Sequence, residues 1–311
     1  MKISVIIPTY KREEVLCQTI ESVIDGINKS NFATESELII VDQTKEHSTR
    51  TTLFLNNLKG KIKYIYEEKP NLPNARNIGI KNSTGEIIVF LDDDIILHDG
   101  FFDNVIECYK YQGVKSVVGV PILKNMTGEN ILLNNQSQLK RIIQLTLKKI
   151  ICLKKFSVIT PIGLLFSDRD HSEAGYADAG QGCCMSFRRD IFDKIGSFDT
   201  NYEGNALREE TDFFCRLKKN KFKCYFSPVV ALDHLMENTG GCRNDFDDKY
   251  WQTYFNNQFY FYKKNFGFKK WYISLLLLFD IITIIKNGMN YRDVIDNSYS
   301  RAVTLLSELK L

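Results

Sequence analysis

The amino-acid sequence predicts an α/β fold with a mostly parallel sheet, flanked by helices and followed by a helical C-terminal extension. Short, uniformly apolar runs such as Ile3–Ile7 and Ile87–Leu91 alternate with helix-like segments through the first hundred residues. Continuous apolar runs are typical of strands that are buried on both faces, as in a parallel sheet covered by helices. Residues 245–311 have a helical pattern and many aromatic side chains, which predicts the extension.

Four strands and three helices are predicted in the first hundred residues. The strands are Ile3–Ile7, Leu38–Val41, Lys63–Tyr66 and Ile87–Leu91, and the helices are Glu13–Ile27, Ser48–Leu58 and Pro73–Asn82. The turn residues Pro8-Thr9-Tyr10 end the first strand, and Gly85 stops the third helix. Strands that alternate with helices in this way indicate a sheet with helices on both faces, typical of nucleotide-binding proteins.

Beyond Gly100 the order of the elements changes. The expected elements are a helix at Phe101–Tyr111, a strand at Ser116–Val120, a basic amphipathic insertion at about 124–158, a strand at Gly182–Phe187, a short segment at Asp190–Gly196, a helix at Arg208–Lys219, and strands at Cys224–Phe226 and Val229–Leu232. Because no repeat or linker separates the halves 1–120 and 121–243, we expect them to share one continuous sheet. A domain at 1–243 and a helical extension at 244–311 follow from this pattern.

Composition and charge exclude several classes of protein. The chain has 311 residues, of which 44% are hydrophobic and 25% charged, and this excludes disordered and low-complexity chains. The net charge of +3 is too small to favour a nucleic acid as partner. The eight cysteines form no C-x-x-C pair, so neither a zinc finger nor a disulfide framework is expected. Because a strand-like run follows the first residues and no apolar run reaches about 18 residues, we expect a cytoplasmic protein without signal peptide or spanning helix.

Three consecutive acids, Asp92, Asp93 and Asp94, directly follow the apolar run Ile87–Leu91. In parallel sheets the ligand-binding crevice lies at the carboxyl ends of the strands. Crowded carboxylates repel one another unless a cation is bound, and oxygen-rich clusters suit Mg²⁺ or Mn²⁺ beside a diphosphate. A solvated turn, or an N-cap ahead of a helix at Phe101, explains the same position. Both interpretations are open on position alone.

A series of motifs resembles family 2 glycosyltransferases over roughly residues 2–243. In chain order they are Val5–Arg12 (VIIPTYKR), Ile39–Asp42 (IIVD), Asn74–Ile80 (NARNIGI), Phe90–Asp94 (FLDDD), Gly182–Arg189 (GCCMSFRR), Ile195–Asp199 (IGSFD) and Arg208–Asp212 (REETD). The resemblance implies a GT-A fold and an inverting transfer of a sugar from a nucleotide-sugar to an acceptor hydroxyl. It also implies that residues 1–120 bind the donor, that residues 121–243 bind the acceptor, and that Mn²⁺ or Mg²⁺ takes part.

The resemblance implies a set of nucleotide-sugar contacts. They are Pro8, Thr9, Tyr10, Asp42, Gln43, Arg76, Asp92, Asp93 and Arg243. Tyr10 matches a side chain against the nucleobase. Gln43 departs from the family, which commonly has a second Asp at this position, but an amide carbonyl can accept the same hydrogen bond. Arg243 follows the pair Gly240-Gly241, which is suited to a loop that closes over the diphosphate.

A metal site is implied as well. Asp94 is expected to bind the ion, Asp92 to contact the ribose or the metal and its waters, and His234 to complete the coordination. His234 is far from the two acids in the sequence. The fold therefore has to bring the histidine to the end of the strand that precedes the acids.

The resemblance places the catalytic base at the second acid of an acidic motif, which is Glu210 in this chain, with Glu209 and Asp212 as alternates. The base has to lie opposite the departing diphosphate, because displacement with inversion is in line. The first turn of a helix also keeps a carboxylate ionised, as a base requires. Acids that merely complement the helix dipole would show the same local pattern.

Two segments suggest contact with an anionic membrane, close to a glycan or lipid-linked acceptor. Residues 138–155 contain six basic side chains and no acid, and their apolar residues share one helical face. The apolar run Trp271–Ile285 is flanked by lysines. Such helices can rest on an anionic bilayer. Packing on the core with solvated lysines explains both segments equally well.

Other activities lack their sequence signatures. A nicotinamide dehydrogenase should carry G-x-G-x-x-G after the first strand, and a processive polysaccharide synthase should carry Q-x-x-R-W; neither occurs here. A non-catalytic nucleotide-sugar-binding module and a sugar-nucleotide pyrophosphorylase-like enzyme are the alternatives, although the glycine-rich first loop of the latter is missing. We therefore predict a non-processive, metal-dependent glycosyltransferase that builds a cell-surface glycan or polysaccharide.

Overall fold

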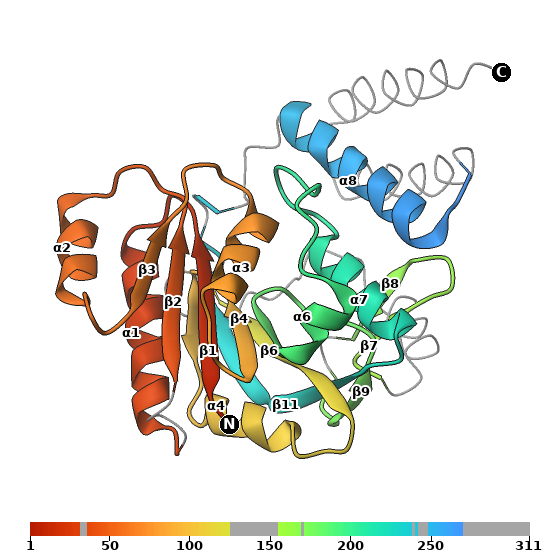
Figure 1. The fold of residues 1–311 in the computed structure, drawn as a ribbon, viewed down its shortest axis with the longest axis horizontal. Coiled ribbons are helices and arrows are strands. Elements are labelled where there is room, and N and C mark those ends of the chain that lie inside the picture. Colours follow the sequence, from red (N-terminus) through yellow and green to blue (C-terminus); the bar gives the residue numbers. More distant parts are fainter. Residues whose placement is uncertain (32–35, 125–154, 169–170, 238–239, 242–247, 270–311) are drawn as a thin grey trace, which may run out of the picture.

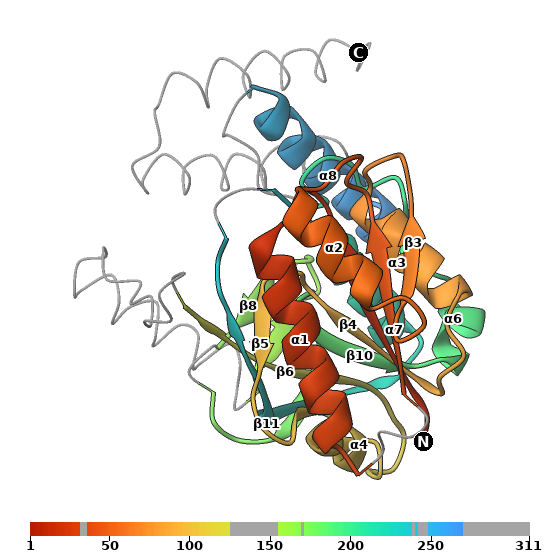
Figure 2. The same ribbon diagram turned by 90° about the vertical axis from the view of Figure 1, so that its left-hand side faces the viewer.

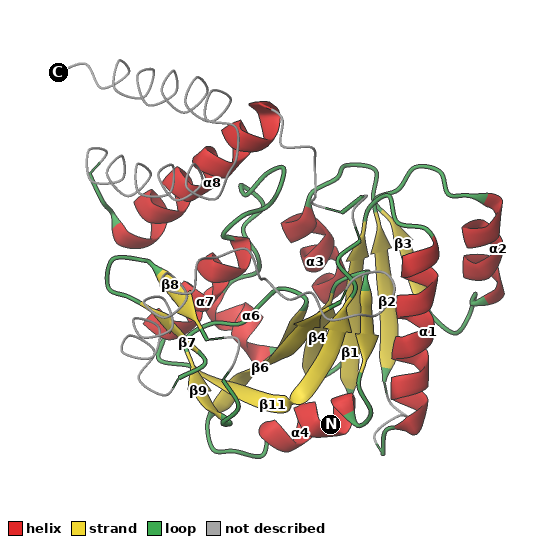
Figure 3. Ribbon diagram, turned by 180° about the vertical axis from the view of Figure 1, so that it is seen from behind, coloured by secondary structure: helices red, strands yellow, loops and turns green. Residues whose placement is uncertain are grey.

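A computed structural model describes residues 1–31, 36–124, 155–168, 171–237, 240–241 and 248–269. One large sheet crosses the molecule, and helices cover both of its faces (Figures 1 and 3). The predicted α/β class is confirmed. Most of the basic insertion and the run Trp271–Ile285 lie outside the described residues. No helix in the described ranges is long and apolar enough to cross a bilayer.

Nine strands form the main sheet in the order β3-β2-β1-β4-β10-β6-β11-β5, with β9 also paired to β11. The strands of the first half are β1 (Ile3–Thr9), β2 (Glu37–Asp42), β3 (Lys63–Tyr66), β4 (Ile87–Leu91) and β5 (Ile95–Leu97). Those of the second half are β6 (Val114–Leu123), β9 (Gly175–Ala177), β10 (Cys184–Arg188) and β11 (Lys223–His234). A separate antiparallel pair is formed by β7 (Ser157–Ile159) and β8 (Leu165–Ser167).

Strand directions bring several strand ends to one edge of the sheet. The strands β3, β2, β1 and β4 are parallel to one another. β10 runs antiparallel between β4 and β6, and β11 is parallel to β6. β11 therefore runs in the same direction as β1 and β4, and the three carboxyl ends share an edge. The two halves of the chain form one continuous sheet, as the absence of a linker predicts.

Helices cover both faces of the sheet, and the side chains of β1 point alternately to one set of helices and to the other. On one face lie α1 (Glu14–Lys29), α2 (Thr49–Asn57) and α4 (Phe101–Cys108), and on the other lie α3 (Leu72–Lys81), α6 (Asp190–Ile195) and α7 (Glu209–Lys219) (Figure 2). Ile3, Val5 and Ile7 are buried against α1 and α4, whereas Ile6 is buried with residues of α3 and α7. Successive strand residues point to opposite faces, so one apolar run feeds two core clusters.

One helix of the C-terminal extension belongs to the core. α8 (Asp248–Phe266) places Phe255, Phe261 and Tyr262 among the buried residues, together with Phe213 and Phe214 of α7. Burying a large aromatic side chain stabilises a fold by about 1.5–3 kcal/mol. The helix therefore packs on the sheet-covering layer rather than standing apart, while residues 270–311 lie outside the described part of the chain.

Several predicted boundaries differ from the structure for local reasons. The segments Cys224–Phe226 and Val229–Leu232 belong to one strand, β11, whose register against β6 shifts between Phe226 and Ala231. Pro228 lies in that irregular stretch, and proline in a strand is tolerated at such bulges. The helix predicted at Phe101–Tyr111 ends earlier, at Cys108. The strands β5, β7, β8 and β9 have three residues each, too few for a periodic pattern.

Candidate functional site

The side chains expected to be functional gather where β1, β4 and β11 end. Pro8 and Thr9 lie at the end of β1, Asp92–Asp94 directly follow β4, and His234 is the last residue of β11. The carboxyl ends of parallel strands form the ligand crevice of α/β sheets. The topology therefore places His234 beside Asp92–Asp94, although the histidine is distant from these acids in the sequence.

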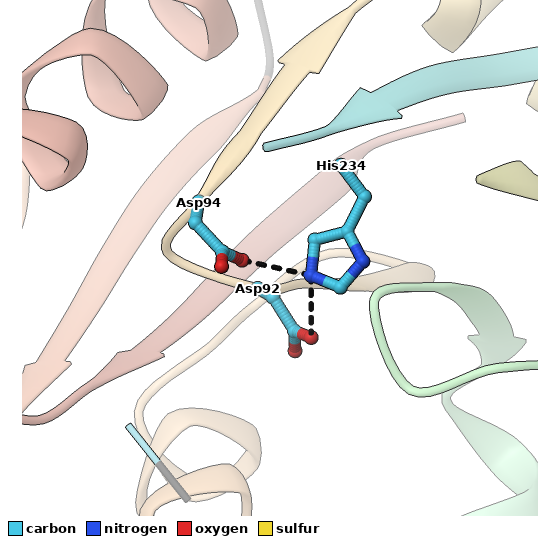
Figure 4. Close-up of side chains that lie close together, drawn as sticks. All are labelled: Asp92, Asp94 and His234. Atoms are coloured by element: carbon cyan, nitrogen blue, oxygen red, sulfur yellow. Dashed lines mark ion pairs between the residues drawn. The ribbon is translucent and has the colours of Figure 1, made fainter. Parts of the chain in front are cut away.

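Asp92, Asp94 and His234 form a compact cluster (Figure 4). One ligand atom from each residue lies within 4.8 Å of the others. His234 Nε2 is 2.9 Å from Asp94 Oδ1 and 4.0 Å from Asp92 Oδ2. Desolvation raises the pKa of Asp92, while the nearby His234 and Arg76 act in the opposite direction. The two carboxylates suit Mn²⁺ or Mg²⁺, and the imidazole nitrogen, a poor ligand for Mg²⁺, favours the transition metal of the two.

Arg12 forms ion pairs with Asp93 and with Asp94 of this cluster. Its buried guanidinium donates from Nε to Asp93 Oδ1 over 3.2 Å and from Nη2 to Asp94 Oδ2 over 3.4 Å. The backbone N–H of Glu237 also donates to Asp94 Oδ2, so the opposite oxygen of Asp94 is the one beside His234. Burial raises the pKa of Asp93 to about 7, although Arg12 opposes this shift. Arg12 is the last residue of the motif Val5–Arg12, but the sequence assigns it no role. Its contacts with Asp93 and Asp94 are evident only from the fold.

A cavity of about 810 Å³ opens in front of the cluster, a volume that suits a nucleotide-sized ligand. Its walls include Pro8, Thr9, Tyr10, Gln43, Asp92 and Asp93, together with Arg12, Lys69, Asn71 and Asn74. Gln43 Nε2 donates to the carbonyl of Lys69 over 2.7 Å. This bond leaves the carbonyl end of the amide as the acceptor that Gln43 can offer to a ligand.

Asp42 is placed differently from the other implied nucleotide contacts. It is fully buried and is not among the residues that line the cavity. Its Oδ2 lies 2.6 Å from His47 Nε2 and accepts from the Tyr64 hydroxyl, and its Oδ1 accepts from the backbone N–H of Thr44. The hydrogen bond to Asp42 raises the pKa of His47. Asp42 thereby organises the turn that carries Gln43.

A second cavity, of about 550 Å³, adjoins the first, and Leu72, Asp92 and His234 line both. Glu210 lies in the wall of this smaller cavity. A Cβ atom at Gly182, in the same wall, would lie 2.7 Å from Arg76 Nη2 and 3.4 Å from Glu210 Oε1. A glycine at this position therefore leaves space for the Arg76 guanidinium, close to the Glu210 carboxylate. The metal-binding candidates and the predicted base thus line two adjoining cavities.

Arg76 connects the acids of both regions. It is buried, pairs with the buried Glu209, and has Nη2 3.9 Å from Asp92 Oδ1. It lines the smaller cavity and not the larger one, where a nucleotide contact was expected. Within the described residues the carboxylate of Glu210 has no ion pair. Of these two adjacent acids, Glu209 is paired with a cation, whereas Glu210 has no such partner in the part of the chain that the structure describes.

Asp212, the other alternate for the base, is tied into the protein interior. It is fully buried and lines neither cavity. Its carboxylate accepts from the side chains of Tyr202 and Asn265 and pairs with Arg216 and Lys264. These partners come from α7, from α8 and from the preceding loop, so Asp212 holds these elements together.

The glycine pair packs against the turn after β1. Gly240 and Gly241 both have positive φ angles, of 75° and 61°, and the N–H of Gly241 donates to the carbonyl of Tyr10. A Cβ atom at Gly240 would lie 2.2 Å from the carbonyl oxygen of Lys11, so only glycine fits there. Arg243 lies outside the described residues, and its contact with the diphosphate stays a prediction.

Other cavity residues carry no sequence signal for a role in binding. They include Lys69, Asn71, Thr200, Glu203, Thr253, Tyr254 and Gln258. Asn71 does show the N-cap pattern, and its side chain accepts from the backbone N–H of Asn74. Its Nδ2 donates to the carbonyl of Thr200, which joins the two walls of the larger cavity. No local pattern indicates such a long-range contact.

Comparisons with known sequences agree with this arrangement. TarP of Staphylococcus aureus, a poly(ribitol-phosphate) β-N-acetylglucosaminyltransferase, is 34% identical over 121 residues, which are 38% of this chain and 36% of TarP. The minor teichoic acid biosynthesis protein GgaB of Bacillus subtilis is 30% identical over 145 residues, or 45% of this chain and 16% of GgaB. A GalNAc(5)-diNAcBac-PP-undecaprenol β-1,3-glucosyltransferase of Campylobacter jejuni is 31% identical over 113 residues, or 34% of each chain. The matches span about a third or less of these relatives.

Solved structures share the fold at low sequence identity. The mannosyltransferase PcManGT of Pyrobaculum calidifontis, solved with GDP-Man and Mn²⁺, superposes with a TM-score of 0.54 at 15% identity, over 86% of this chain and 65% of that one. GalNAc-T7, solved with UDP, GalNAc and Mn²⁺, gives 0.57 at 14% identity, over 84% and 50%. These likenesses show that the α/β fold is the GT-A fold.

The family assignment rests on a match to most of the N-terminal domain. The family model described as glycosyl transferase family 2 matches residues 4–196, more than half of the chain. The matched stretch contains the turn after β1, the Asp92–Asp94 motif and Gly182, all of which meet at the site. This chain therefore belongs to glycosyltransferase family 2.

Proposed function

We propose that this glycosyltransferase moves a sugar from a nucleotide-sugar to an acceptor hydroxyl, with inversion at the anomeric carbon and with a bound divalent cation. The observation that carries the proposal is the place of the Asp92, Asp94 and His234 cluster between two adjoining cavities. The larger cavity has six of the nine implied nucleotide contacts in its walls, namely Pro8, Thr9, Tyr10, Gln43, Asp92 and Asp93, and the smaller has Glu210. A donor in the first and an acceptor in the second meet at the cluster.

The donor atoms present fit Mn²⁺ or Mg²⁺. Asp92, Asp94 and His234 would hold the ion, with Asp94 offering the oxygen that neither Arg12 nor the Glu237 N–H occupies. When bound, the cation supplies positive charge that stabilises the leaving diphosphate. The solved relatives PcManGT and GalNAc-T7 hold Mn²⁺ together with a nucleotide or nucleotide-sugar, which supports the proposal for this chain.

Glu210 is the proposed general base. Its carboxylate takes the proton of the acceptor hydroxyl while that oxygen forms a bond to the anomeric carbon. The bond from this carbon to the diphosphate oxygen breaks on the opposite face, and the diphosphate leaves with the electron pair. Because Arg76 neutralises Glu209, a second negative charge is not added beside Glu210.

We further propose that the acceptor is a cell-surface glycan and that transfer is non-processive. TarP is named for transfer to poly(ribitol phosphate), GgaB for minor teichoic acid biosynthesis, and the Campylobacter jejuni relative for transfer to an undecaprenol-linked acceptor. The sequence lacks the Q-x-x-R-W motif that the family resemblance associates with processive members. UDP-GlcNAc and UDP-glucose are therefore the first donors to test.

A cytoplasmic location with peripheral contact to the inner face of the cell membrane is also proposed. The six basic residues of the segment 138–155 support it, since each cation near an anionic surface adds about 1 kcal/mol of attraction. Co-sedimentation with vesicles of phosphatidylcholine and phosphatidylglycerol measures the contact. Retention that disappears when Lys148 and Lys149 become Gln supports the proposal, and equal binding to purely zwitterionic vesicles contradicts it.

Thermal unfolding with candidate ligands tests the donor and metal sites directly. A ligand that binds the folded state alone raises the midpoint, by about 2.7 kcal/mol of stabilisation at a hundredfold excess over Kd. We expect UDP-GlcNAc or UDP-glucose to raise the midpoint in a Mn²⁺-dependent way in the wild type. Asp94→Asn should abolish the Mn²⁺ dependence. An unchanged Mn²⁺ response in Asp94→Asn would remove the metal assignment.

The variant Glu210→Gln separates catalysis from binding. It preserves shape and hydrogen-bonding capacity but cannot take a proton, so we expect transfer to fall by about 10²–10⁴-fold. Donor binding in the thermal assay should stay as in the wild type. Retained transfer would exclude Glu210 as the base and direct attention to Glu209, whereas lost donor binding would indicate a role in the donor site.

A further inference from the structure

The loop 203–208 runs between the two cavities and leads directly into Glu209 and Glu210. Its first residues line the larger cavity, and the others line the smaller one. Three of its residues have left-handed backbone angles: Gly204 with φ of 59°, Ala206 with 50° and Arg208 with 75°. Residues with a Cβ atom rarely adopt these angles, and they do so where surrounding structure holds them.

Two neighbouring amides of α8 hold this loop at both ends. Asn257 Oδ1 accepts from the backbone N–H of Glu203 over 3.3 Å, and its Nδ2 donates to the Glu203 carbonyl over 2.8 Å. Gln258 Oε1 accepts from Arg208 Nε over 2.7 Å. The two amides are only 3% and 2% exposed. Because buried amides are costly without partners, these bonds fix the loop against the helix.

Arg208 transmits this support to the helix that carries Glu210. Its guanidinium lies over the rings of Phe261 and Tyr262 of α8, at 5.2 and 6.0 Å. Its carbonyl accepts from the backbone N–H of Asp212 over 2.8 Å, which is a bond of the first turn of α7. The side chain of Arg208 is therefore held by α8 while its backbone starts α7. Gln258 is therefore connected to Glu210 through Arg208 and the adjoining Glu209.

We propose that Asn257 and Gln258 are positioning residues for the general base. By clamping the loop 203–208 in its left-handed conformation, they place Glu210 in the wall of the smaller cavity, next to the metal-binding cluster. The role rests on the proposed function of Glu210. Both residues lie beyond the stretch 4–196 that the family model matches, so the family match assigns them no role.

Hydrogen exchange and donor turnover together test this clamp. The variant Gln258→Ala is compared with Gln258→Glu, which keeps an acceptor for Arg208, and with Gln252→Ala, an exposed glutamine on the same helix. We expect amide exchange in the peptide covering 203–212 to rise about tenfold in Gln258→Ala, with the β1 and β4 peptides unchanged. The hydrolysis of UDP-GlcNAc or UDP-glucose with Mn²⁺ measures turnover without an identified acceptor.

Turnover and binding are expected to separate in this set. In Gln258→Ala, kcat should fall by up to about 10²-fold, as misplaced catalytic groups do, while the donor KM and the nucleotide-induced thermal shift stay the same. Gln258→Glu should recover most of the rate, and Gln252→Ala should match the wild type. Loop exchange in Gln258→Ala that equals that of Gln252→Ala overturns the clamp. Faster exchange with unchanged kcat overturns its positioning role, whereas a wild type that binds no nucleotide-sugar overturns the proposed function instead.

Discussion

At the scale of single residues, the buried carboxylate of Asp42 is surrounded by hydrogen-bond donors of the protein itself. Asp42 lies beneath the turn that carries Gln43, and its two oxygens are shared among His47, Tyr64 and the Thr44 N–H. The hydrogen bond between Asp42 and His47 favours the charged form of the imidazole and raises the pKa of His47. The protonation of His47 therefore affects a contact that lies beneath the turn carrying Gln43.

A pH dependence of stability follows from this pair. The hydrogen bond with Asp42 raises the pKa of His47 above 6.5, so the stabilisation is complete below that value and is lost as pH rises through the higher folded-state pKa. We expect His47→Asn to lower the free energy of unfolding more at pH 6 than at pH 9. Urea denaturation at both values measures it, and Asp42→Asn should remove the same dependence. A pH-independent difference between wild type and His47→Asn would contradict the assignment.

At the scale of elements, the contact between β6 and β11 determines where His234 lies. The register between the two strands shifts between Phe226 and Ala231, and a carbonyl of this stretch approaches β6 closely. Gly119 of β6 accommodates it: a Cβ atom there would lie 2.0 Å from the Val230 carbonyl oxygen. The bulge thus requires a residue without a side chain on the neighbouring strand.

Gly119→Ala should therefore be destabilising. A new methyl group forces backbone or core atoms apart, and overpacking of this kind costs about 1–3 kcal/mol. Gly175→Ala in β9 is the matched control, since nothing lies within 4 Å of its added Cβ atom, and we expect a change within about 0.5 kcal/mol. Chemical denaturation of the two variants decides. Equal stabilities would show that β11 moves away from Gly119 without cost.

Considered as a whole, the molecule shows which features a single sequence can predict. Continuous apolar runs determined β1 and β4, and the acids after β4 indicated a metal site because strand ends collect ligands. The contacts of Arg12 with Asp93 and Asp94, and of Gln258 with Arg208, were not predictable. The motif that contains Arg12 gives this residue no role, Gln258 belongs to no motif, and both reach their partners through tertiary packing. The local sequence predicts two strands where the structure has one bulged strand, β11, because a proline such as Pro228 is typical of the end of a strand.

Long-range ion pairs bind α8 to the rest of the protein, and they give the last prediction. Lys264 Nζ lies 2.6 Å from Asp199 and 2.9 Å from Asp212. Burial acts against ionisation of Asp199, but the hydrogen bonds from Lys264 and from the other donors around this carboxylate lower the pKa of Asp199 to about 2.

The stabilisation from this pKa shift is present above the usual pKa of 3.8 and is lost as the pH falls towards 2. Lys264→Met should therefore unfold at a higher pH than the wild type in an acid titration followed by circular dichroism. At neutral pH the variant should lose about 1–3 kcal/mol. Lys263→Met, at the adjacent exposed lysine, should behave like the wild type. Coincident acid transitions for the two variants would show that the ion pairs of Lys264 contribute nothing to the acid stability.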